Sequence, residues 1–253
     1  MNVGIQPESS EGDPLQRMQE RLDHATKSDD RDTIYADYAV SLSQDGDPRG
    51  KDLVDKIENT ELRKSVKAYT DFQLVQAAVR DKDIAEISRL VKSGELSSIQ
   101  KVWALTSGAK LVVAAERSRA SDLLEEALAE SRRISASDPD RARALTAVAV
   151  GFGEIDRVRS WEILGEVVKA ANSAEAYTGE DSRVTSRLQT KFMVVMNQST
   201  AEDFDLLTVF RHLARADLLR AIQLAKTFTG EAPRAVATLA IARSVLEKRK
   251  DSA

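Results

Sequence analysis

The feature that most constrains the fold of this chain is a two-helix pattern that recurs along it. The first half of the pattern is an apolar stripe with the spacing i, i+4, i+7, and an alanine always takes its middle position. Residues at this spacing lie on one face of a helix, so each copy predicts a helix with one buried face. The three copies are Tyr35-Ala39-Leu42, Leu105-Ala109-Val112 and Leu145-Ala149-Phe152.

An arginine follows ten residues after each of these alanines and opens the second half of the pattern. This half reads Arg, a small residue, any residue, an acid or amide, and an aliphatic residue. Its copies begin at Arg49, Arg119, Arg159 and Arg220. A degenerate copy, which lacks the arginine, begins at Asp83. From 49 to 83, 119, 159 and 220 the successive spacings are 34, 36, 40 and 61 residues. A period of about 34–47 residues is typical of stacked helical hairpins.

These spacings predict an all-α protein without a β-sheet. We expect a right-handed α-solenoid of about six stacked helical hairpins with a repeat length of about 34–40 residues. The composition agrees, because aromatic residues make up only 5% of the chain while Ala, Leu, Glu and Arg are plentiful. Alanine and straight-chain residues lose little conformational entropy in a helix.

The same pattern predicts the organisation of the chain. We expect a polar N-terminal tail over residues 1–13, regular hairpin repeats over 14–172, an irregular insertion over 173–183, and helical repeats with a C-terminal helix over 184–253. An extra helix from about residue 183 to 197 would account for the long last spacing. Its apolar residues would be Val184, Leu188, Phe192 and Val195.

Charge and cysteine content exclude several classes of function. The net charge of −4 argues against nucleic acid as a partner, because such proteins usually present a basic face to the phosphates. The absence of cysteine excludes disulfides, thiol catalysis and thiolate metal sites. No stretch is apolar enough for a membrane span, and residues 1–13 lack a signal-peptide pattern. We therefore expect a cytoplasmic location, with the mature part of an exported protein as the alternative.

Few residues point to chemistry. The only histidines, His24 and His212, belong to no recognisable metal-binding spacing. We therefore predict no catalytic, cofactor-binding or metal-ligating residue and no cofactor. The repeated arginines each stand three residues before an acid or amide, which predicts a structural role within the hairpins. A ring of arginines that lines a ligand groove is the alternative.

The helical hairpins at this period resemble the tetratricopeptide and HEAT class of α-solenoids, closely over residues 30–172 and more loosely over 200–248. The resemblance implies a non-enzymatic scaffold that binds a protein or peptide along a concave face. We expect the first helix of each hairpin to line that face, with Asp37, Lys110 and Arg143 among its polar positions. The segment from Ser173 to Met196 departs from the repeat and adds the candidate contacts Tyr177, Phe192, Met193 and Met196.

The alternative function is an enzyme built on a helical array. It would be a lyase or hydrolase that acts on an anionic or sugar substrate with Asp, Glu, Arg and Tyr side chains, such as Tyr35, Tyr38 and Tyr69. A deep pocket with convergent carboxylates of perturbed pKa would favour this enzyme. A long open groove without such a pocket would favour the scaffold.

Overall fold

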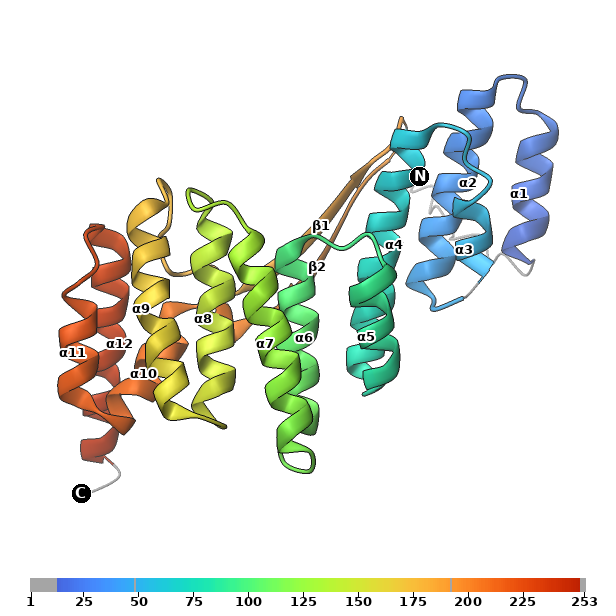
Figure 1. Ribbon diagram of the computed structural model, residues 1–253. Coiled ribbons are helices and arrows are strands. Elements are labelled where there is room, and N and C mark those ends of the chain that lie inside the picture. The colour runs from blue at the N-terminus through green and yellow to red at the C-terminus, as the bar shows by residue number, and fades with distance from the viewer. Residues whose placement is uncertain (1–12, 48, 192, 251–253) are drawn as a thin grey trace, which may run out of the picture. The chain divides into compact units, whose positions relative to one another are not determined.

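The computed structural model describes residues 13–47, 49–191 and 193–250, and over these residues the chain is mostly helical (Figure 1). A single β-hairpin interrupts the helices there. In chain order the elements are α1 (Pro14–Asp23), α2 (Ser28–Gln44), α3 (Arg49–Val54), α4 (Thr60–Arg80), α5 (Ile84–Ser93), α6 (Ser98–Val112), α7 (Arg117–Arg133), α8 (Pro139–Gly153), α9 (Arg157–Ser173), β1 (Arg183–Gln189), β2 (Val194–Thr200), the 3-10 helix η1 (Glu202–Phe204), α10 (Leu206–Ala216), α11 (Leu218–Ala225) and α12 (Glu231–Lys250).

The chain divides into two compact units. Unit 1 consists of Met1–Gln73 and Arg187–Val195, and unit 2 consists of Leu74–Ser186 and Met196–Ala253. Helix α4 and both strands therefore contribute residues to each unit.

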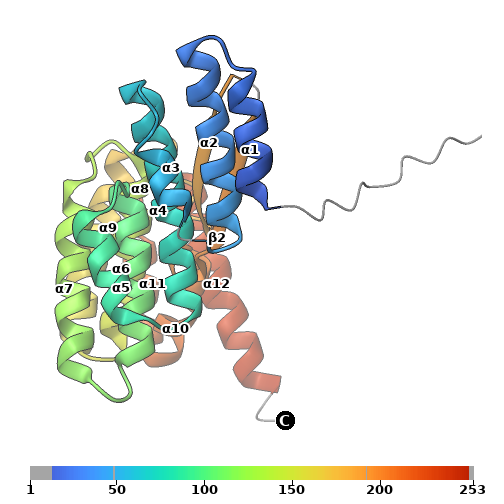
Figure 2. The same cartoon turned by 90° about the vertical axis from the view of Figure 1, so that its right-hand side faces the viewer.

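Unit 1 is built around α1, α2 and α3. Helices α1 and α2 lie side by side in both views (Figures 1 and 2). The core of unit 1 includes Ala39, Ile57 and Tyr69, which are 0–1% exposed. The buried carboxylate of Asp32 accepts hydrogen bonds from the backbone N–H groups of Glu58 and Asn59, each at 2.8 Å. This carboxylate satisfies backbone donors in the connection between α3 and α4, where the chain leaves helical geometry.

Unit 2 contains two clear helical hairpins, α6–α7 and α8–α9, followed by α10, α11 and α12 (Figure 1). Side-chain caps fix where these helices begin. Ser97 and Gln100 form a reciprocal capping box at the start of α6. At the start of α9, the Asp156 side chain accepts from the N–H groups of Val158 and Arg159. The Asp156 cap therefore fixes the end of the turn between α8 and α9.

The two halves of the repeated pattern meet inside each hairpin. In the α8–α9 hairpin the Ser160 hydroxyl donates to the Ala149 carbonyl oxygen at 2.7 Å. In unit 1 a Cβ added to Gly50 would lie 2.9 Å from the Ala39 carbonyl oxygen. The small residue after the arginine therefore lets the second helix approach the backbone beside the alanine of the first. Such close approach excludes larger side chains at both positions.

Arg49, Arg119 and Arg159 each pair with an acid of their own or the neighbouring hairpin, which agrees with the predicted structural role, whereas Arg220 lies over the Trp161 ring. Among the described residues, only Arg159 of these four pairs with the acid three residues after it in the sequence. Arg49 Nη2 lies 2.6 Å from Asp47, and Arg119 Nη1 lies 3.4 Å from Glu116. Arg159 pairs with both Glu125 and Glu162 at 3.2 Å. Acids of the protein thus balance the charges of these three arginines, and no ligand is needed to pair with them.

The prediction of a helix over residues 183–197 is wrong, and so is the expectation of no β-sheet. This segment forms the hairpin β1–β2, closed by the Thr190 N–H donating to the Met193 carbonyl at 2.8 Å. Val184, Ser186 and Leu188 are buried while the residues between them are exposed. A spacing of four residues fits one face of a strand as well as one face of a helix, so Val184 and Leu188 could not distinguish the two. Phe192 lies outside the described residues.

Candidate binding groove in unit 2

Three adjoining hollows run along the helices of unit 2. The first, of about 220 Å³, lies between α6 and the segment from Thr200 to Phe204. The second, of about 300 Å³, is lined from α6, α7 and α8, together with Asp203 and His212. The third, of about 360 Å³, lies between α8, the start of α9 and α10. Volumes of this size accommodate single side chains or small ligands.

Shared lining residues join the three hollows into one groove. Lys110 and Asp203 line both the first and the second hollow. Val150, Glu154 and His212 line both the second and the third. We call the lining of all three hollows the binding groove. It follows α6, α8 and α10, and α6 and α8 are the first helices of the two hairpins.

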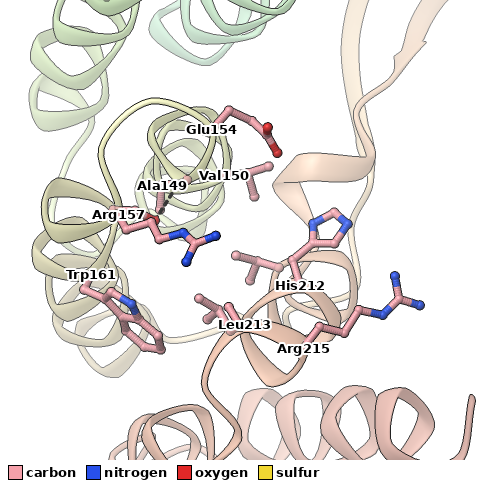
Figure 3. Close-up of a pocket in the computed structure, with 12 residues that line it drawn as sticks. Ala149, Val150, Glu154, Arg157, Trp161, His212, Leu213 and Arg215 are labelled. Atoms are coloured by element: carbon pink, nitrogen blue, oxygen red, sulfur yellow. Dashed lines mark hydrogen bonds between the residues drawn. The ribbon is translucent and has the colours of Figure 1, made fainter. Parts of the chain in front are cut away.

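The third hollow combines an apolar wall with charged residues. Val209 and Leu213 of α10 and Val150 of α8 supply the wall. Figure 3 shows Arg157 and Trp161 on the α9 side of the hollow and His212 on the α10 side, with the Arg157 guanidinium directed toward the space between them. An apolar surface beside a cationic group suits a ligand that carries both an aliphatic part and a carboxylate.

Neighbouring residues hold the side chains of Trp161 and Arg215, which both line the third hollow, in place. The Arg220 guanidinium lies 4.2 Å from the centre of the Trp161 ring, which is within the range of a cation–π interaction. Arg215 Nη2 lies 2.9 Å from Glu247, which also accepts from Arg211 at 2.9 Å. Hydrogen bonds to the Glu247 carboxylate lower its pKa, and the bond from Arg211 contributes more than the bond from Arg215. Arg215 therefore belongs to a local ion-pair network of α10 and α12.

Three polar side chains of the groove are available to a ligand. Within the described residues Glu154, Arg157 and His212 form no ion pair and no side-chain hydrogen bond, and all three are exposed. Glu154 comes from the turn between α8 and α9, Arg157 is the first residue of α9, and His212 comes from α10. Their positions give the groove one permanent donor of charge-assisted hydrogen bonds and one carboxylate acceptor.

An ion pair crosses the groove between the first and second hollows. The Lys110 ammonium of α6 pairs with Asp203 of η1, whose side chain is only 12% exposed. Beside it the Trp103 indole N–H donates to the Thr200 carbonyl at 3.3 Å. These contacts attach the end of β2 and η1 to α6. The predicted contact residue Lys110 therefore lies in the groove, with its charge already paired.

Arg143 and Tyr177, two other predicted contact residues, are buried in unit 2. Arg143 pairs with Asp140 at 2.5 Å and with Asp181 at 3.3 Å, and it donates to the Asp181 and Arg183 carbonyl oxygens. Burial raises the pKa of the Tyr177 hydroxyl, and the nearby Thr146 side chain opposes the rise only in part. Arg143 thus holds the segment before β1 against α8, whereas the buried Tyr177 hydroxyl has no hydrogen-bond partner among the described residues.

Two predicted contact residues, Asp37 and Met193, belong to unit 1, and Met196 belongs to unit 2. Asp37 of α2 is half-buried, and its burial raises the pKa of its carboxyl although Arg21 and Thr190 oppose the rise. Met193 packs against the core of unit 1. Met196, in unit 2, is 65% exposed. The structure therefore does not bring the predicted residues together into one site, and their role in binding a partner stays a prediction.

Sequence reasoning missed most of the groove. Glu154, Arg157, Trp161, His212 and Arg215 carry no shared motif, because they come from helices far apart in the chain. One signal was available. Glu154 and Arg157 lie at the junction of α8 and α9, where exposed charged residues follow a buried helix.

The described residues contain no cluster of three or more His, Asp or Glu side chains that could hold a metal ion. Among the helices that the structure describes, none combines the length and apolarity needed to cross a bilayer. Comparison with models of known protein families, with curated proteins and with solved structures finds no match to this chain.

Proposed function

We propose that this chain is a non-enzymatic scaffold that binds a peptide segment of a partner protein along the groove of unit 2. The observation that carries the proposal is that three hollows lie next to one another along α6, α8 and α10 and share lining residues. A long open groove suits an extended or helical segment of a partner better than a small substrate. We further propose that the hairpins form a right-handed α-solenoid, in which the first helices line the binding face.

The charges and apolar surfaces of the groove indicate which segment it would take. Arg157 offers a planar donor that matches a carboxylate, and the wall of Val150, Val209 and Leu213 offers burial for an aliphatic side chain. We therefore propose a segment with Asp or Glu close to Leu, Ile or Val. Glu154 would accept a hydrogen bond from a backbone N–H of the same segment.

The positions of the perturbed acids favour the scaffold over the alternative enzyme. Burial raises the pKa of Asp37 and of Asp205, which are the described acids with a raised pKa. Neither lines any of the three hollows, and they lie in different units. An acid–base pair would need two such groups within reach of one substrate.

The test is selection of peptides from a random library displayed on phage, with the intact protein as the target. We expect the selected peptides to share an acidic residue beside an aliphatic one. Titration calorimetry should then show at least a tenfold loss of affinity for Arg157→Glu. The matched control is Arg234→Glu, an exposed arginine of α12 outside the lining of the groove. Selected peptides that bind Arg157→Glu as tightly as the wild type would contradict the proposal.

A further inference from the structure

Helix α12 has two apolar faces, and its own fold covers only one of them. Val236, Ala237, Ala240 and Ile241 are at most 7% exposed and pack into unit 2. A second apolar set lies on the exposed side of the same helix, and Leu239 and Leu246 there are 56% and 59% exposed. This set, which we call the α12 stripe, is Ala235, Leu239, Ala242 and Leu246.

The spacing of the α12 stripe is that of a helix–helix seam. Steps of four, three and four residues keep its side chains on one line along the helix. The stripe covers 12 residues, from 235 to 246, and the 11 steps between its ends amount to about 16 Å at 1.5 Å per residue. Exposed leucines that occur singly need no explanation, but a row with this spacing is typical of a surface that packs against another helix.

The order of residues in the stripe identifies its occupant. Alanine and leucine alternate, and a two-fold axis between Ala240 and Ile241 relates the two ends of the stripe. An antiparallel second copy of α12 would then place each leucine opposite an alanine. Leu239 would face Ala242 of the other copy, and Leu246 would face its Ala235. Large side chains opposite small ones let two helices pack closely, and an isologous interface requires this kind of self-complementarity.

We propose that this protein forms a two-fold symmetric homodimer through antiparallel packing of its α12 stripes. The interface goes beyond the proposed peptide-binding function, because no stripe residue lines any of the three hollows. One helix pair with two leucines per copy is smaller than the roughly 800 Å² per partner of a standard interface. We therefore expect a weak dimer whose population depends on concentration.

Sedimentation velocity of the full chain over a hundredfold range of concentration tests the proposal. The mass should rise from the monomer value of 27.8 kDa toward twice that value. Leu239→Glu should raise the dissociation constant at least tenfold without loss of helicity in circular dichroism. The control is Leu219→Glu, because Leu219 is 74% exposed and lies on α11, outside the stripe. A wild-type chain that stays monomeric, or a dimer that survives Leu239→Glu, would overturn the proposal.

A mixing experiment tests the antiparallel register. Leu239→Glu and Ala242→Lys should each prevent self-association, because each places a charge at the seam. An equimolar mixture of the two variants should form a heterodimer in native mass spectrometry, since the two new side chains face each other across the axis. The absence of any heterodimer would show that the two stripes do not meet in this register. Association of the wild type with a different number of copies would also contradict it.

Discussion

Gly50 and Gly165 both lie in helices, but an added methyl group would meet different surroundings at the two positions. At Gly50 a Cβ would lie 2.7 Å from Ser43 Oγ and 2.9 Å from the Ala39 carbonyl oxygen. At Gly165, in the interior of α9, a Cβ would meet nothing within 4 Å. The first glycine is needed for close packing of two helices, and the second only adds flexibility to the unfolded chain.

We therefore expect opposite effects of the same substitution on stability. Gly50→Ala should lower the free energy of unfolding by about 1–3 kcal/mol, because the Ala39 backbone cannot move aside cheaply. Gly165→Ala should raise it by about 0.5–1 kcal/mol through better helix propensity. Urea unfolding followed by circular dichroism measures both changes. Equal effects at the two sites would show that the close approach of Gly50 to Ala39 does not matter.

At the scale of elements, the β-hairpin is held to the helices by a few specific contacts. The Arg143 side chain, only 10% exposed, pairs with Asp140 and Asp181. It also donates to the carbonyl oxygens of Asp181 and Arg183, just where β1 begins. Within unit 2 these bonds position the base of the hairpin against α8, so one arginine of a helix determines where a strand starts.

Removal of this side chain should loosen the base of the hairpin. Arg143→Ala should cost about 2–4 kcal/mol of stability, since it removes several charge-assisted hydrogen bonds from a buried site. It should also speed hydrogen exchange of the Ala201 amide, which donates to the Ser182 carbonyl at 2.7 Å. Arg141→Ala is the control, because Arg141 makes one long bond of 3.4 Å to the Ile134 carbonyl. Unchanged exchange at Ala201 in Arg143→Ala would show that Arg143 does not hold the hairpin.

At the scale of the whole molecule, the groove and the α12 stripe are separate surfaces of unit 2. They share no residue, so the two proposals can fail independently. A dimer would carry two grooves, and a ligand with two binding segments could then gain affinity without any new contact.

Binding measurements on the two variants should separate these effects. Leu239→Glu should bind a single selected peptide with the affinity of the wild type, because its groove is intact. The same variant should lose affinity for a peptide that carries two copies of the segment on a flexible linker, and titration calorimetry measures both. Arg157→Glu should weaken binding of both peptides. If Leu239→Glu weakens the single peptide as much as Arg157→Glu does, then stripe and groove are coupled.

The repeated pattern was sufficient to predict a mostly helical chain and arginines that lie close to acids. Helical periodicity is a local property, so the stripe around Ala149 indicates a helix whatever its neighbours are. The arginines likewise find acids within a few residues or in the adjacent hairpin, as Arg159 does with Glu162 and Glu125. The contact with Glu162 follows from spacing along one helix, whereas the contact with Glu125 depends on the packing of neighbouring hairpins.

Only the tertiary structure decided between a helix and a hairpin after residue 183, and only it revealed the groove. Val184 and Leu188 fit either period, and the choice depended on what covers each face of the segment. Glu154, Arg157 and His212 come together because α8, α9 and α10 pack in a particular order. The positions of these residues in the sequence do not indicate how the three helices pack. Local periodicity therefore determined most of the helices, whereas long-range packing determined the β-hairpin and the groove.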